Sequence, residues 1–85
     1  MAQKKSITGV VTDAIGETVI GASVVEVGTT NGVITDISGK FTLMVDPNGK
    51  IKVSYVGYQP QVIDVKGKNS FNIKLKEDSE MLDEW

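Results

Sequence analysis

A strict alternation of apolar and polar residues near the end of this chain constrains its fold more than any other feature. Within residues 70–76 the apolar set is Phe71, Ile73 and Leu75, and the polar set is Asn72, Lys74 and Lys76. Successive side chains of a β-strand point to opposite faces, so this pattern predicts a strand with one buried face and one solvated face.

Four further segments carry the same two-residue period. Residues 40–45 and 51–55 alternate cleanly, and residues 7–11 and 61–65 fit the same pattern. The predicted inward residues are Phe41, Leu43, Val45, Ile51, Val53, Tyr55, Ile7, Val11, Ile63 and Val65. Gly9 takes an inward position in the first strand, where a missing side chain allows another group to approach the backbone closely.

The alternation is less regular in residues 19–27. Ala22 and Val24 share their parity with Glu26, whereas Val25 and Val27 have the other parity. Because an acidic residue is expected to face water, a β-bulge or a change of face is the simplest interpretation of this segment.

Turn signals separate these runs at short intervals. Residues 28–32 and 36–39 are glycine-bearing turns that bracket one more short strand, and Asn-Gly occurs at 31–32 and 48–49, a pair that suits the positive φ angles of tight hairpins. No segment has a helical period. About seven short strands predict an all-β fold, a small antiparallel seven-stranded sandwich. Outward lysines in residues 50–52 and 74–76 are expected to discourage pairing at sheet edges.

Composition excludes several function classes. The 85 residues suffice for one small domain, and cysteine and histidine are both absent, which removes disulfides, most zinc sites and the usual general base. Residues 1–76 hold nine lysines and six acidic residues, whereas residues 77–85 hold five acidic residues and no lysine. We therefore expect a domain over residues 6–76, followed by a flexible acidic tail over 77–85. Scattered lysines without arginine argue against nucleic-acid binding, and no apolar run is long enough to insert into a membrane.

Two loops superficially resemble calcium sites. Residues 36–39 and 46–49 each begin with aspartate and contain glycine, but neither continues the calcium-loop pattern to a bidentate glutamate. Turns built on aspartate and glycine are the simpler interpretation. Without His or Cys, catalysis would need a Ser-Lys pair or two carboxylates in a pocket, which a small sandwich hardly offers. We therefore expect no enzyme activity, no catalytic residue, no metal and no cofactor.

Residues 55–60 are the candidate contact segment. Tyr55 shares parity with the inward residues of its strand, so burial is its ordinary interpretation. Val56 and Tyr58 have the other parity and flank a glycine, and exposed aromatics near a turn can anchor a protein partner or stack on sugars. A structural role for Tyr58, fixing a turn of the sandwich, is the alternative.

Several ordered motifs together resemble a known family. They are residues 7–13, 21–24, 28–32, 35–36 with 39–41, and 54–58. These motifs are similar to the carboxypeptidase regulatory-like domain and, more narrowly, to the N-terminal periplasmic extension of SusC-like TonB-dependent outer-membrane receptors. The similarity runs from about Ser6 to Glu84. Two positions depart from the family pattern: Thr18 follows Glu17 where proline is frequent, and Trp85 stands where valine is usual.

The resemblance implies a transthyretin-like or Ig-like sandwich without catalytic residues, on the periplasmic face of the outer membrane as part of a longer protein. The implied partners are the plug and barrel of the parent receptor and the periplasmic TonB system, and in isolation a monomer is expected. In that family a stretch like Leu82, Asp83 and Glu84 leads into a segment resembling the TonB box, which we expect beyond Trp85 in a longer protein. The candidate partner contacts are therefore Val56, Tyr58, Leu82, Asp83 and Glu84.

Two functional hypotheses follow from these observations. The first is a non-catalytic accessory domain of a TonB-dependent importer of glycans or peptides, which docks or couples in the periplasm. The second is a free-standing or surface-displayed module for carbohydrate binding or adhesion, in which Tyr58 and neighbouring loops would contact the ligand.

Overall fold

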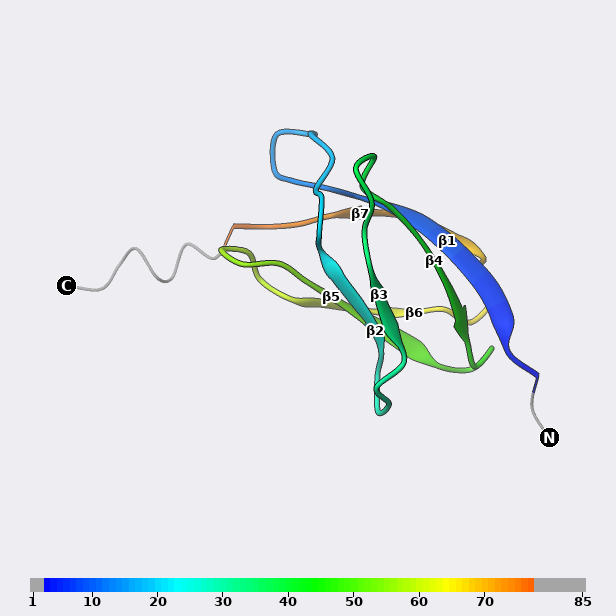
Figure 1. Ribbon diagram of the computed structural model, residues 1–85. Coiled ribbons are helices and arrows are strands. Elements are labelled where there is room, and N and C mark those ends of the chain that lie inside the picture. Colours follow the sequence, from blue (N-terminus) through cyan, green and yellow to red (C-terminus); the bar gives the residue numbers. More distant parts are fainter. Residues whose placement is uncertain (1–2, 78–85) are drawn as a thin grey trace.

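Seven β-strands form two facing sheets in the computed structural model, which describes residues 3–77 (Figure 1). The first sheet has the strand order β4-β1-β7, with β4 at Lys40–Val45, β1 at Lys5–Thr12 and β7 at Ser70–Lys74. The second has the order β3-β2-β5-β6, with β3 at Gly32–Ile34, β2 at Ser23–Glu26, β5 at Lys50–Ser54 and β6 at Gln61–Asp64. The expected all-β sandwich with seven strands is confirmed.

One strand pair departs from the expected antiparallel arrangement. β1 and β7 run parallel, with Gly9 opposite Phe71, whereas the other four ladders are antiparallel. A hairpin forces its two strands to be antiparallel, but β1 and β7 come from opposite ends of the sequence and are free of that constraint. The direction of such a distant pair is not encoded in the local pattern.

The core lies between the two sheets and follows the predicted parity. All the predicted inward residues of β1, β4 and β7 are buried, together with Ile51, Val53 and Val65, and Ile63 packs against them half-buried. Tyr55 is the exception, because it is 38% exposed rather than buried. β5 ends at Ser54, so the two-residue period no longer applies to Tyr55.

Gly9 and Phe41 form a cross-strand pair that explains the glycine. The two residues lie opposite each other in the β1–β4 ladder, and a Cβ atom on Gly9 would lie 2.5 Å from Phe41 Cε2. The same Cβ would be 3.1 Å from the carbonyl oxygen of Phe71. The aromatic ring therefore occupies the space above the glycine, as predicted from the missing side chain.

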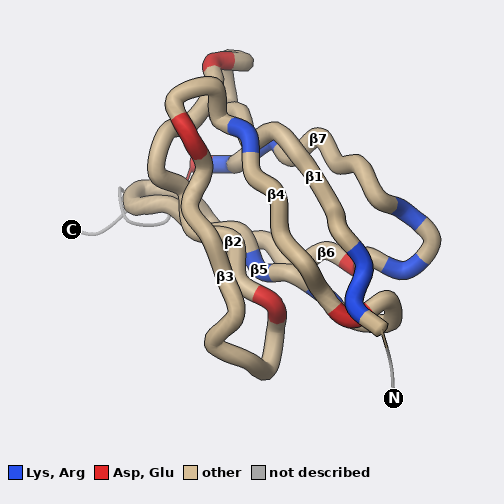
Figure 2. The backbone as a smooth tube through the Cα atoms, turned by 45° about the vertical axis from the view of Figure 1, so that its right-hand side comes forward, with Lys and Arg blue, Asp and Glu red and all other residues tan. Residues whose placement is uncertain are grey.

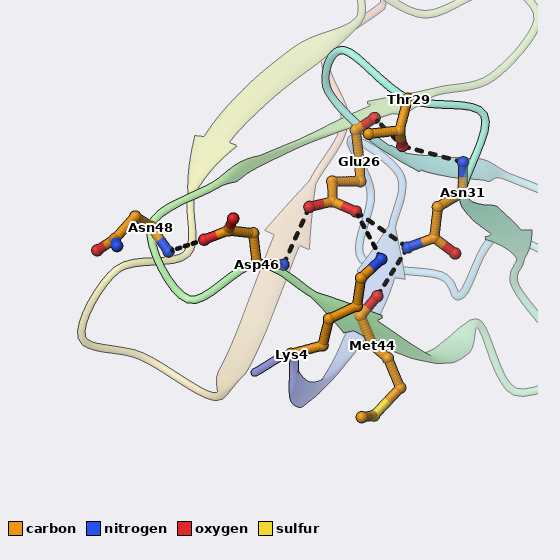
Figure 3. A network of polar contacts seen from close by, with 7 residues as sticks. All are labelled: Lys4, Glu26, Thr29, Asn31, Met44, Asp46 and Asn48. Carbon is orange, nitrogen blue, oxygen red and sulfur yellow. Dashed lines mark hydrogen bonds and ion pairs between the residues drawn. The ribbon is translucent and has the colours of Figure 1, made fainter. Parts of the chain in front are cut away.

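The expected change of face in residues 19–27 occurs before β2, since Val19 is buried, Ile20 is exposed and Ala22 is buried again, whereas the expected bulge is absent from β2 itself. Ala22, Val24 and Glu26 are all buried, so the alternation continues without a bulge and the acidic side chain faces inward. Glu26 is accommodated because donors surround its carboxylate: Oε2 accepts from the Asp46 N–H at 3.0 Å, and Oε1 accepts from Asn31 Nδ2 at 3.1 Å (Figure 3). A buried polar group satisfied in this way does not carry the penalty of an unpaired one.

This Glu26 network joins the two sheets along one side of the sandwich. Asn31 Nδ2 also donates to the carbonyl of Met44 in β4 at 2.7 Å, and Lys4 Nζ lies 3.7 Å from Glu26 Oε1 (Figure 3). The hydrogen bonds from Asp46 and Asn31, followed by the Lys4 charge, lower the pKa of Glu26 below its ordinary value, although burial alone would raise it. The carboxylate therefore stays ionised at neutral pH.

The turns are built on aspartate and glycine as expected, but the two Asn-Gly pairs do not supply the positive φ angles. Gly32 and Gly49 do not have positive φ, whereas Gly28 (86°) and Gly39 (73°) do, so the Asn-Gly prediction is wrong for these glycines. Asp36 Oδ1 accepts from the N–H groups of Ser38 and Lys40. Asp46 Oδ1 accepts in the same way from Asn48 at 2.8 Å. Both calcium-like loops are thus Asx turns, as the simpler interpretation predicted.

The outward lysines have different neighbours in the two sheets. β5 lies between β2 and β6, so Lys50 and Lys52 are not on an edge strand and the edge interpretation is wrong for them. β7 is an edge strand, and its Lys74 is exposed.

Candidate functional site

The described chain ends beside the turn that contains Val56 and Tyr58. Tyr58 forms an isolated β-bridge with Glu77, and the N–H of Gln59 donates to the carbonyl of Lys76 at 2.8 Å. Figure 1 shows this turn between β5 and β6 next to the last described residues. The candidate contact segment and the point where the chain continues are therefore fixed to each other by backbone contacts.

Local backbone geometry explains why this turn projects its side chains. The N–H of Tyr58 donates to the carbonyl of Tyr55 at 3.1 Å, and Gly57 has a φ of 85°, a conformation that favours glycine. The rings of Tyr55 and Tyr58 lie 6.1 Å apart with an interplanar angle of 39°. The turn thus holds two aromatic side chains together at one end of the sandwich.

The two predicted contact residues differ in exposure. Val56 is 86% exposed at the tip of the turn. Tyr58 is half-buried, and its side chain packs against the hydrophobic core. Val56 is accordingly free to contact a partner, whereas Tyr58 helps to hold the turn on the sandwich, which is the structural role considered for it. Leu82, Asp83 and Glu84 lie outside the described residues, as does the predicted acidic tail from residue 78 onward.

Ile20 lies beside the two tyrosines, although the sequence did not identify it as a candidate contact residue. It is 56% exposed and lines a shallow depression of about 250 Å³ together with Asp13, Tyr55 and Tyr58. Its parity matches Ala22 and Val24, so alternation alone would have placed it inward. Alternation does not apply to Ile20, because β2 starts only at Ser23. We call Ile20, Tyr55, Val56 and Tyr58 the exit-end surface.

The Tyr58 hydroxyl at the centre of the exit-end surface stays uncharged. Burial raises the pKa of the Tyr58 hydroxyl, and the nearby carboxylates of Asp13 and Glu77 raise it further. Asp13 is itself held in place, because its Oδ1 accepts from the N–H groups of Ile15 and Glu17 at 3.0 and 2.9 Å. The surface is therefore apolar and aromatic with an acidic margin.

This arrangement suits contact rather than chemistry. Apolar and aromatic side chains at the centre of a surface, with charges at its margin, are typical of protein interfaces. Among residues 3–77, no group of three acidic side chains could hold a metal ion. The same residues contain no helix long and apolar enough to cross a membrane.

Comparison with known proteins places the chain in a family. It is 48% identical over 83 residues to the TonB-dependent receptor SusC of Bacteroides thetaiotaomicron, and 30% identical over 82 residues to the TonB-dependent receptor P39 of Formosa agariphila. These alignments cover 98% and 95% of the chain but only 8% of each receptor, so the chain spans a small part of the relatives' length. The model of the CarboxypepD_reg-like domain matches residues 7–85, and the chain belongs to that family.

Proposed function

We propose that this chain is a non-catalytic accessory domain of a TonB-dependent nutrient receptor, located on the periplasmic face of the outer membrane. The observation that carries the proposal is the 48% identity to SusC over nearly the whole chain, combined with a surface suited to contact rather than catalysis. In this role the domain docks against, or couples to, the remainder of the receptor and the TonB system.

The position of the exit-end surface supports a docking role. The chain continues from Glu77, which is bridged to Tyr58, so the following part of the polypeptide begins at the exit-end surface. A covalent tether raises the effective concentration of one part of a protein near another. Even a weak apolar contact at Val56 would then be populated within one polypeptide.

Deletion of the domain from a full-length receptor tests the proposal. Removing the equivalent of residues 6–76 should leave the barrel inserted and able to bind ligand, because its stability comes from its own closed strand ladder. Uptake should fall, since the TonB-contacting segment would lose the neighbour that sets its accessibility. The measurement compares surface receptor level, ligand affinity and growth on the transported nutrient. Unchanged growth at an unchanged receptor level would rule out coupling, and loss of surface receptor would indicate a role in biogenesis instead.

A point substitution tests the exit-end surface more finely. Val56→Asp places a charge at the tip of the turn and should weaken a docking contact about tenfold, the effect expected when a central apolar contact is lost. Val27→Asp is the matched control, because Val27 is also exposed, at 48%, but lies after β2 in a different turn. Nutrient uptake by the two full-length variants at equal receptor level is the measurement. Equal uptake would show that docking does not use Val56, whereas direct binding of a soluble glycan by the isolated domain would favour the carbohydrate-binding alternative.

A further inference from the structure

The outer edge of β7 is longer than the edges at β3 and β6 and, unlike the edge at β4, does not face the Glu26 network. β4 and β3 form one side of the sandwich, where the side chains of Asn31 and Glu26 bond to the backbone of Met44 and Asp46 in or just after β4. β3 is only three residues long and β6 only four. β7 is a longer edge strand, and it contacts β1 on one side only.

The hydrogen bonds to β1 show which backbone groups of β7 point away from the sheet. Thr8 N–H donates to Asn69 O, and Leu75 N–H donates to Thr12 O, so the odd-numbered residues of β7 face β1. The even-numbered residues therefore direct their N–H and C=O groups outward. At one end these groups are occupied: Gln61 Nε2 donates to Lys74 O at 2.5 Å.

Three exposed residues remain along this edge with outward groups that lack a protein partner in the described part of the chain. They are Ser70 and Asn72, with both N–H and C=O, and Lys74, with its N–H. Outward backbone groups on an edge strand form a template for one more strand. About five residues of an extended peptide match this length.

Charge selects which peptide fits. Residues 66–76 contain four lysines and no acidic residue, and Figure 2 shows basic segments at both ends of β7. Asn72 and Lys74 are exposed on the outer face of the sheet, where the side chains of an added strand would lie beside them. The lysines in and around β7 would repel those of a second copy, which disfavours pairing between two copies of β7, whereas acidic residues of an added strand are attracted.

The inner face of an added strand has different requirements. Phe71 and Ile73 point into the core and are only 5% and 4% exposed, so inward residues of the added strand would continue an apolar layer. We propose that the outer edge of β7 binds, by strand addition, an extended segment of a partner protein in which acidic and apolar residues alternate. Backbone hydrogen bonds to Ser70, Asn72 and Lys74 hold the segment, and the lysines of residues 66–76 select its charge.

A peptide titration of the 85-residue chain tests this proposal. The probe is a synthetic peptide with blocked ends in which Glu and Val alternate, and the readout is the ¹H–¹⁵N NMR spectrum together with amide hydrogen exchange. Saturable shifts centred on residues 70–74 and slower exchange of the Ser70, Asn72 and Lys74 amides are expected. Binding should weaken with added salt, because the lysines are exposed. A peptide with Lys in place of Glu should not bind.

Two variants separate the backbone contribution from the charge contribution. Asn72→Pro removes an outward donor but no bond to β1, and proline is tolerated at such an edge position, so binding should be lost while the spectrum stays folded. Lys74→Glu combined with Lys76→Glu should weaken binding at least about tenfold. If Asn72→Pro does not fold, the same peptide N-methylated at alternate residues replaces it and should not bind.

Three outcomes would overturn the proposal. They are equal binding of the acidic and basic peptides, shifts centred on β3 or β6, and concentration-dependent shifts of β7 without peptide, which would identify a second copy as the occupant. The titration uses this chain alone, whereas the deletion experiment uses the full receptor. A negative peptide titration therefore does not contradict the proposed accessory role, and a negative deletion experiment does not contradict the proposed strand addition.

Discussion

Replacement of Phe41 by alanine is expected to lower the free energy of unfolding by about 3–5 kcal/mol. The ring is 4% exposed, belongs to the central core and covers the backbone at Gly9, so its removal leaves a cavity that β1 and β4 cannot close. Domains have typically about 5–15 kcal/mol of stability, and a chain of this size buries a smaller share of its surface than a larger domain does. The variant should therefore be partly unfolded at moderate temperature, as urea denaturation would show.

The control for Phe41→Ala is a substitution on the opposite face of a strand. Lys74→Gln changes an exposed side chain on β7 and should alter stability by no more than about 0.5 kcal/mol. Similar losses for the two variants would mean that the inner and outer faces of the strands are misassigned.

A double-mutant cycle isolates the contact between Phe41 and Gly9. In the wild-type background, Gly9→Ala should be destabilising by about 1–3 kcal/mol, because the new methyl group would overlap the Phe41 ring. In the Phe41→Ala background the methyl group would enter the vacated space, so the same substitution should have a smaller effect. Additive effects would show that the ring does not constrain Gly9.

The predictable part of this fold is local. The parity of residues 40–45 and 70–75 places Phe41 and Phe71 in the core correctly, because alternation depends only on the strand continuing. The inward placement predicted for Tyr55 is wrong because β5 ends at Ser54, and alternation holds only while the strand continues. Sequence patterns identify strands well but define their last residue poorly, and the exposed position of Tyr55 follows from that last residue.

The parts that could not be predicted depend on contacts between distant residues. Nothing near Glu26 in the sequence reveals that the Asp46 N–H, 20 residues away, donates to its carboxylate. The parallel pairing of β1 and β7 is equally non-local. In the candidate site, Val56 and Tyr58 were identified from local turn chemistry, whereas Ile20 reaches the exit-end surface through tertiary packing.

Replacement of Glu26 by alanine is also expected to have a large effect, lowering the free energy of unfolding by about 2–3 kcal/mol. Beside a carboxylate that is only 5% exposed, the Asp46 N–H would lose its acceptor and the Asn31 side-chain amide would lose one of its two acceptors. A buried donor left without an acceptor costs about 1–3 kcal/mol. Asp64→Ala, which removes an exposed carboxylate on β6, is the matched control and should have a much smaller effect. A loss at Asp64 equal to that at Glu26 would contradict the view that the network joins the sheets.

The pH dependence of stability gives an independent test of the same carboxylate. The pKa of Glu26 is lowered in the folded state from its ordinary value of 4.5, so the folded protein binds this proton less readily than the unfolded chain. Its contribution is therefore fully present above about pH 4.5 and is lost as the pH falls through the folded-state pKa. Glu26→Gln keeps the shape but cannot titrate, so the stability difference between wild type and variant should shrink below pH 4.5. The pKa of Asp36 is also lowered, but Asp36 is present in both proteins and cancels in the difference. A difference that stays constant from pH 7 to pH 3 in urea denaturation would show that the Glu26 carboxylate is not stabilised in the folded state.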